Sequence, residues 1–383
     1  MESLWVAMIA AILILLASVV SIEAGISVAL IEITMGVIAG NVLGLTSPPW
    51  MDFLASFASI LLTFLAGAEV DHQVLRERLK ESLLIGGVSF LAPFLGAWLF
   101  CAVALGWSSP AAQIAGVALS TTSLAVVYAV LVETGLTHTP IGKLIMASTF
   151  VTDFGVALAL AALFIRPTWW LLPFLAASAL IIWLMIALQP WFFRRYGDRV
   201  IEPEIKGAVA ALLVLMFLAE RAQSHAVLPA FVLGLALAPI FHRHRELGGR
   251  FRVVAFALLT PFFFLKGGLN VSLGLVWANF GLLVLLLLVK QVTKFLGVYL
   301  FARRYVPRDA MFTTLLMSTG LTFGTISSLY GLNAGILTRA QFSVLVTVVV
   351  ASAVIPTLIA QRWFSPAMGE ERPVAAGVEA GRG

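Results

Sequence analysis

Long apolar stretches follow one another along almost the whole chain, separated by short clusters of charged, proline and glycine residues. A helix that crosses the hydrocarbon core of a bilayer needs about 20 mainly apolar residues. Dividing the chain at the polar clusters predicts thirteen spans, near residues 4–22, 26–44, 51–70, 83–106, 110–133, 140–165, 168–192, 204–221, 225–241, 251–268, 275–301, 309–331 and 340–361. The pattern therefore predicts an all-α polytopic membrane protein in which short loops join the spans.

The composition supports this class and excludes others. Hydrophobic residues make up 61% of the 383 residues and charged residues only 11%, whereas soluble domains carry about a quarter of charged residues. The formal charge of +5 is what basic clusters beside spans produce, so it does not indicate nucleic acid. The single cysteine, Cys101, excludes a disulfide framework. The sequence shows no phosphate-binding loop motif, so it does not indicate ATP-driven transport.

The lysine and arginine residues predict the orientation of the chain. Cytoplasmic loops of membrane proteins are enriched in these residues, and most of the 24 fall on one side of the predicted layout. This distribution predicts an outside N-terminus and a cytoplasmic C-terminus. The stretch from His242 to Arg252 is interpreted as an ordinary basic loop, and residues 363–383 as a disordered cytoplasmic tail.

Two spans carry polar breaks at mid-depth. Spans five and twelve lie seven crossings apart, and because this number is odd they run in opposite directions through the membrane. Spans four to six and spans eleven to thirteen therefore form a predicted inverted repeat. Secondary transporters often place an ion site where two discontinuous helices meet. The alternative is that the hydroxyl groups only bond back to the preceding helical turn. The residues predicted to line the site are Ser120, Thr121, Thr122, Ser123, Ser318, Thr319 and Thr322.

Few ionisable residues lie within the predicted spans, and each is a functional candidate because a charge at the bilayer centre is costly. Asp153, near the middle of the sixth span, is the only acid at that depth in either repeat. A carboxylate there can hold a proton or a cation in competition. Lys290 and Lys294 share a helix face, and either could meet Asp153, with Lys294 favoured. Glu32 is predicted to line a funnel or to cap a neighbouring helix.

The sequence resembles the monovalent cation/proton antiporters, and within them the bacterial NapA-like sodium/proton antiporters. The similarity covers nearly all of the chain up to about residue 362. The motifs that carry it are Ile31-Glu32-Ile33-Thr34-Met35-Gly36-Val37-Ile38-Ala39-Gly40, Phe64-Leu65-Ala66-Gly67-Ala68-Glu69, Ser120-Thr121-Thr122-Ser123, the Asp153 segment, Pro261-Phe262-Phe263-Phe264 and Lys294-Phe295-Leu296-Gly297.

The resemblance implies a homodimer in the bacterial inner membrane that exchanges Na⁺ or Li⁺ for protons by an elevator-like movement, without a cofactor. Asp153 would bind the metal ion (Na⁺) and the proton, and Lys294 would be the core lysine. In the implied division, the dimerisation domain consists of residues 1–82 and 203–274, and the core consists of two repeats, residues 83–166 and 275–362. Residues 167–202 form a linker helix, and residues 363–383 form the tail.

The chain departs from the family pattern beside the aspartate. Relatives carry an acid or an asparagine at the position of Thr152, and a hydroxyl can bind a cation but holds no second negative charge. Thr152 therefore joins the predicted ion site, while the proton stoichiometry stays open. Lys290 and Glu32 are kept as gating or funnel candidates. Two alternatives remain, a K⁺/H⁺ antiporter of the same superfamily and a sodium-coupled solute symporter of similar fold.

Overall fold

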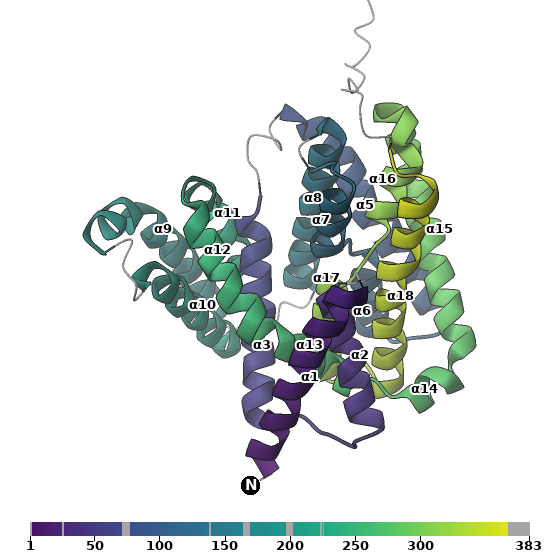
Figure 1. The fold of residues 1–383 in the computed structure, drawn as a ribbon, viewed down its shortest axis with the longest axis horizontal. Helices are drawn as coiled ribbons and strands as arrows, with labels where there is room; N and C mark the ends of the chain where they lie inside the picture. Colours follow the sequence, from purple (N-terminus) through teal and green to yellow (C-terminus); the bar gives the residue numbers. More distant parts are fainter. Residues whose placement is uncertain are drawn as a thin grey trace, which may run out of the picture. The chain divides into compact units, whose positions relative to one another are not determined.

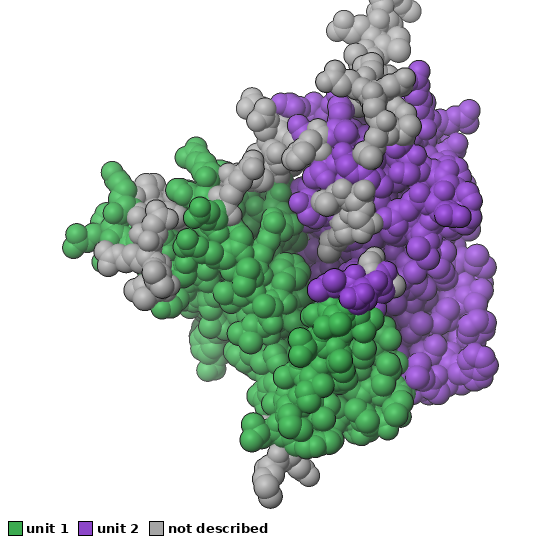
Figure 2. Space-filling view, in the orientation of Figure 1, with its two compact units in different colours: residues 1–20, 32–72, 157–269 green, residues 21–31, 73–156, 270–383 purple. Residues whose placement is uncertain are grey.

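The computed structural model describes residues 2–24, 27–70, 77–137, 139–163, 169–196, 202–222, 224 and 226–366. Every regular element in these ranges is a helix (Figure 1). The predicted disordered tail lies outside the described residues from 367 onward. The chain divides into two compact units, coloured separately in Figure 2, each built from three separate segments. Unit 1 holds Met1–Val20, Glu32–His72 and Ala157–Leu269, and unit 2 holds Ser21–Ile31, Gln73–Val156 and Asn270–Gly383.

Unit 1 contains the first three helices of the chain and the helices from α9 to α13. Its helices are α1 (Glu2–Ala24), α2 (Val28–Asn41), α3 (Pro49–Ala68), α9 (Leu171–Tyr196), α10 (Pro203–Arg221), α11 (Val227–Arg243), α12 (Arg245–Val254) and α13 (Thr260–Leu269). A π-helical turn, Ala255–Leu259, joins α12 to α13. The first residues of α2 and the last residues of α1 are grouped with unit 2.

Unit 2 contains the segments that carry the predicted polar breaks. Its helices are α5 (Leu79–Leu99), α6 (Ser109–Ser120), α7 (Leu124–Glu133), α8 (Pro140–Leu163), α14 (Leu273–Ala278), α15 (Phe280–Tyr305), α16 (Ala310–Met317), α17 (Thr322–Asn333) and α18 (Arg339–Trp363). The last turns of α8 are grouped with unit 1. These ranges overlap the predicted repeat segments 83–166 and 275–362, while the roles given to the domains stay predictions.

Each of the thirteen predicted spans coincides with one helix or with two or three consecutive helices. Within the described residues, eight helices are long and apolar enough to cross a membrane, and two apolar helices, Val28–Asn41 and Val227–Phe241, are shorter. The prediction of an all-helical membrane protein is therefore confirmed. The number of crossings stays a prediction.

The structure corrects two sequence predictions. The stretch from His242 to Arg252, predicted as a loop, is helical from Arg245 onward, because Phe251 is buried on one face and packs against Phe64 and Phe241. The span predicted near 275–301 is interrupted at its start. There the Asn279 side-chain amide donates to the carbonyl oxygen of Leu275 at 2.7 Å, which ends α14 before α15 begins.

Glycine residues let the helices of unit 1 approach closely. A Cβ atom on Gly67 of α3 would collide with the carbonyl oxygen of Phe231 on α11, and one on Gly234 of α11 would collide with that of Phe64. Gly36 of α2 and Gly268 of α13 are in equally close contact. Small residues at helix interfaces are the usual means by which membrane helices gain van der Waals contact. These pairs therefore hold unit 1 together by backbone packing.

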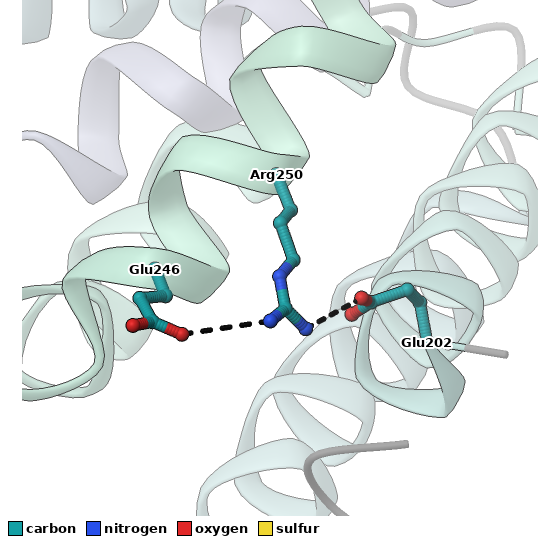
Figure 3. Close-up of polar contacts among 3 residues, drawn as sticks. All are labelled: Glu202, Glu246 and Arg250. Atoms are coloured by element: carbon teal, nitrogen blue, oxygen red, sulfur yellow. Dashed lines mark hydrogen bonds and ion pairs between the residues drawn. The ribbon is translucent and has the colours of Figure 1, made fainter. Parts of the chain in front are cut away.

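Charged residues join α12 to its neighbours within unit 1. Arg250 lies between Glu202, which precedes α10, and Glu246 of its own helix, with nitrogen–oxygen distances of 2.7 Å and 3.5 Å (Figure 3). Arg252 pairs with Glu69, the residue after α3, at 3.0 Å. Both arginine side chains are about half exposed, so these ion pairs add little stability individually.

Candidate functional site

Two helices of unit 2 are interrupted where the sequence predicts breaks. The α6 helix ends at Ser120 and α7 begins at Leu124, while α16 ends at Met317 and α17 begins at Thr322. The two breaks contact each other, because the Thr122 hydroxyl donates to the carbonyl oxygen of Met317 at 2.9 Å. The prediction of discontinuous helices is confirmed, and the structure brings the two breaks together.

Several hydroxyl groups of the breaks bond to their own helix, as the alternative interpretation predicted. Ser120 and Thr121 donate to the carbonyl oxygens of Val117 and Ala118, at 2.8 Å and 3.0 Å. Ser318 donates to the carbonyl oxygen of Thr314 at 2.7 Å. These hydroxyls satisfy backbone groups freed at the helix ends, as a buried break requires.

The Thr319 hydroxyl also ties the second break to the first. Thr319 donates to the carbonyl oxygen of Leu316 at 2.8 Å, and its oxygen also accepts from the backbone N–H of Ser123 at 3.4 Å. Ser123 in turn caps α7 by accepting from the N–H of Val126 at 3.4 Å. Thr322 is the first residue of α17. The serine and threonine residues thus act both within and between the broken helices.

Lys294 of α15 is bound by three oxygen atoms. Its ammonium nitrogen lies 2.8 Å from each of three acceptors, namely Ser89 Oγ, Thr122 Oγ1 and the carbonyl oxygen of Met317. An ammonium group has three N–H donors, so this set satisfies all of them. Met317 is the last residue of α16, where the helix dipole is negative and favours a cation. The surroundings of Lys294 are therefore those of a bound ammonium ion.

Asp153 of α8 is the only buried carboxylate among the residues that the structure describes in unit 2, with 1% of its surface exposed. It interacts electrostatically with Lys294. The neighbouring Thr152 hydroxyl is 3.1 Å from two carbonyl oxygens, that of Gly86 on α5 and that of Ser148 on its own helix. Gly86 permits this approach, because a Cβ there would collide with Ser148. The acid is thus held on a helix that is packed closely against α5.

Lys290 lies one turn before Lys294 and has different surroundings. Its side chain is completely buried, and its nitrogen has no hydrogen-bond acceptor among the residues that the structure describes. It lies beside Gly320 in the second break. The two lysines interact electrostatically. Lys290 therefore belongs to the same polar region as Lys294, but without the matched acceptors.

One candidate is grouped with the other unit, and some residues of the site in unit 2 were not predicted. Glu32 is buried, but it lies on α2 in the part grouped with unit 1. Ser89 and Gly86 of α5 were not predicted, although Ser89 is a polar residue inside an apolar stretch and could have been noticed. No group of three or more histidine, cysteine, aspartate or glutamate side chains that could hold a metal ion occurs in the described part of the chain. The atoms able to bind a monovalent cation here are oxygen atoms of Asp153 and of the breaks.

Helical membrane architecture with two broken helices meeting at buried ionisable residues is typical of secondary transporters. The comparison with protein families identifies the group. A family model described as sodium/hydrogen exchanger, transmembrane, matches residues 8–365. The chain belongs to this family, and the predicted membership in the monovalent cation/proton antiporters is confirmed.

Individual relatives are distant but extend over most of the chain. A probable Na⁺/H⁺ antiporter 3 from Methanocaldococcus jannaschii is 24% identical over 87% of this chain and 90% of its own. The Na⁺/H⁺ antiporter NhaS4 from Synechocystis is 27% identical over 88% of this chain and 91% of its own. The Na⁺/H⁺-K⁺ antiporter GerN from Bacillus cereus is 24% identical over 89% of this chain and 90% of its own.

A solved structure supports the fold. The sodium proton antiporter MjNhaP1 from Methanocaldococcus jannaschii superposes with a TM-score of 0.66 at 14% sequence identity, covering 95% of this chain and 97% of the other. A second structure of the same antiporter gives a TM-score of 0.70 at 13% identity, over 94% and 96% of the two chains. The predicted sodium/proton antiporter fold is therefore confirmed.

Proposed function

We propose that this protein exchanges a monovalent cation for protons across the membrane. The proposed cation is Na⁺ in the first place, and Li⁺ is a further substrate. The observation that carries the proposal is the buried Asp153 carboxylate, which interacts electrostatically with Lys294 in the unit that contains the two broken helices. The relatives named as Na⁺/H⁺ antiporters support this choice of substrates.

Competition at one carboxylate is sufficient for exchange. Asp153 as an anion binds the cation, and Asp153 as a neutral acid carries the proton, so the site holds one or the other. Lys294 stays bound to its three acceptors and supplies a fixed positive charge. Thr152 has hydroxyl lone pairs left for a cation, and the broken helices supply further hydroxyl and carbonyl oxygens. In this mechanism all chemistry is ion binding, and no cofactor takes part.

We extend the proposal to the organisation of the transporter. Segments 83–166 and 275–362 form the core that carries the site, and segments 1–82 and 203–274 form the contact of a homodimer. The core moves in an elevator-like manner, with residues 167–202 as the linker. The N-terminus is outside and the C-terminus is in the cytoplasm of a bacterial cell. The resemblance to the antiporter family and the distribution of lysine and arginine support these assignments.

Exchange can be measured with purified protein in proteoliposomes that contain a pH-sensitive dye. Na⁺, Li⁺ or K⁺ is added at several pH values on both sides of neutrality. The assay compares the wild type with Asp153→Asn. Asp309→Asn is the matched control, because it is the same substitution in the same unit at a residue outside the buried site. Valinomycin, added in the presence of K⁺, shows whether exchange moves net charge.

We expect Na⁺ or Li⁺ to drive proton movement in the wild type and in Asp309→Asn, and Asp153→Asn to show none. Proton movement driven equally well by K⁺ would favour the K⁺/H⁺ alternative, for which the name of GerN is a precedent. Full activity of Asp153→Asn would show that the assignment of the carboxylate is wrong. Absence of proton movement with every cation would favour sodium-coupled solute symport.

A further inference from the structure

We propose that the short helix α14 lies in the membrane interface and binds the boundary between lipid headgroups and acyl chains through Trp277 and Phe280. The partner is the lipid surface itself, and the contact sets the depth at which α15 enters the bilayer. This surface of unit 2 lies outside the ion site, so its role is independent of the proposed exchange.

The surface of α14 is apolar and exposed. The helix has six residues, Leu273–Ala278, and none of them is buried. The Trp277 side chain is 80% exposed, and that of Phe280, the first residue of α15, is 53% exposed. Their ring centroids lie 5.9 Å apart, and the sequence carries no charge between Lys266 and Lys290. A contiguous apolar surface of this kind marks a contact with an apolar partner.

A neighbouring helix marks the level of the interface beside α14. The backbone N–H of Ser272, which precedes α14, donates to Ser343 Oγ of α18 at 3.0 Å. Ser343 lies one turn after Arg339, the exposed first residue of α18. Arginine at the end of a span reaches the polar side of the interface, and tryptophan concentrates just inside it. One helical turn is about 5.4 Å, so α14 begins at the depth where tryptophan is favoured.

The α14 helix is separate from the span that follows it. The Asn279 side-chain amide donates to the carbonyl oxygen of Leu275 at 2.7 Å, and the Ser272 hydroxyl accepts from the N–H of Leu275 at 3.4 Å. Figure 1 shows α14 turned away from the axis of α15. Side chains thus satisfy polar groups at both ends of α14, as a helix beside hydrocarbon requires.

The exposed area favours lipid over a second copy of the chain. A stable protein interface buries about 800 Å² on each partner. A large aromatic side chain buries about 150–250 Å², so Trp277 and Phe280 supply about half of that area at most. Contact with lipid requires no minimum area, and an amphipathic tryptophan ring is suited to it. The lipid boundary is therefore the partner that this surface fits.

The anchor has a consequence for the buried lysines of α15. Lys290 lies ten residues after Phe280 on the same helix. At 1.5 Å per residue this is about 15 Å, which is half of the roughly 30 Å thickness of the hydrocarbon core. An aromatic anchor at the start of α15 therefore keeps Lys290 near the centre of the bilayer.

The experiment measures the depth of α14 in proteoliposomes with a nitroxide label on Ala278→Cys. Ala278 is exposed and its replacement leaves both aromatic rings in place, while Cys101 is completely buried, so the wild type should take up no label. Two reference labels define the range. Ala334→Cys lies in the exposed connection between α17 and α18, and Leu285→Cys lies on the exposed face of α15. Collision with oxygen reports lipid, and collision with a water-soluble nickel complex reports water.

We expect the Ala278 label to be intermediate between the two references. Adding Trp277→Ser should shift it toward the water-exposed Ala334 label, whereas Trp277→Tyr should leave it in place, because tyrosine also favours the interface. The proposal would be overturned by a label at the depth of either reference, or by an unchanged depth in Trp277→Ser. Shielding from both reagents would overturn it in favour of a second copy. Because the measurement requires no transport, failure of the exchange function would not affect it.

Discussion

The ammonium nitrogen of Lys294 lies 2.8 Å from the carbonyl oxygen of Met317, the last residue of α16. The same nitrogen binds Thr122 in the other break, so one side chain joins both interrupted helices to α15. A lysine in a transporter core is readily interpreted as a proton carrier. The geometry shows that Lys294 also closes a helix end, which makes its substitution a structural change as well as an electrostatic one.

Replacing Thr122 by valine tests the hydrogen bonds that connect the two breaks with Lys294. The change keeps the shape of the side chain but removes the acceptor for Lys294 and the donor to Met317. We expect the free energy of unfolding to fall by about 2 kcal/mol, because hydrogen bonds to charged groups contribute about 1.5–3 kcal/mol. Thermal unfolding of the purified protein measures the change, and proteoliposome assays should show a lower rate of exchange.

Thr293→Val is the matched control for that experiment. Among the described residues, the Thr293 hydroxyl bonds only to carbonyl oxygens of its own helix, those of Val289 at 2.6 Å and Lys290 at 3.1 Å. Its loss should change the unfolding temperature much less. Equal effects of the two substitutions would mean that the contact between the breaks contributes nothing beyond an ordinary hydroxyl bond.

Gly320→Ala should destabilise the contact between the two helix breaks. A methyl group there would collide with Lys290 Nζ and lie 2.8 Å from Thr121 Oγ1. Overpacking of this kind typically costs about 1–3 kcal/mol, so we expect a lower unfolding temperature together with slower exchange. Gly87→Ala in α5, where no atom lies within 4 Å of the added carbon, should be neutral or slightly stabilising. A Gly320→Ala protein as stable as wild type would show that Lys290 moves away freely.

The ion pair between Asp52 and Lys266 in unit 1 should respond asymmetrically to substitution. The two atoms are 2.8 Å apart, but 46% of the aspartate side chain is exposed and only 6% of the lysine side chain. Asp52→Asn leaves a buried ammonium without its carboxylate, and we expect a loss of about 3 kcal/mol. Lys266→Met leaves a half-exposed carboxylate in contact with water and should cost much less. Thermal unfolding of both variants gives the order, and a greater loss in Lys266→Met would contradict it.

Arg250→Gln should have only a small effect on stability. The Arg250 side chain is 48% exposed, and its contacts with Glu202 and Glu246 are open to solvent (Figure 3). Exposed pairs contribute about 0–1 kcal/mol, and salt screens them. The difference in unfolding temperature between this variant and wild type should shrink further as ionic strength rises. A large difference that persists in high salt would show that Arg250 acts through packing instead.

The sequence predicted the parts of this architecture that depend on local chemistry. Apolar length alone located the helices, and polar residues at mid-depth located both breaks. The aspartate and the two lysines were found because an ionisable residue in a span is rare. Each of these signals can be read from a short stretch of chain, without knowledge of what lies beside it.

Contacts between distant segments could not be predicted in the same way. Ser89 and Lys294 are 205 residues apart in the chain, and nothing in either stretch specifies that they meet. The stretch before Arg252 was misinterpreted for a similar reason. Its charges indicated a loop, whereas burial of Phe251 against residues of α3 and α11 favours a helix. Both outcomes depend on packing partners that only the folded chain supplies.

The glycine pairs of unit 1 have a consequence for how this protein can change over time. At Gly67 and Gly234 the neighbouring atoms are main-chain carbonyl oxygens, which every residue type possesses. A larger residue at either position therefore cannot be compensated by a smaller side chain opposite, because no side chain is there to shrink. Saturation mutagenesis should find these positions intolerant in every genetic background, with no second-site suppressor on the facing helix.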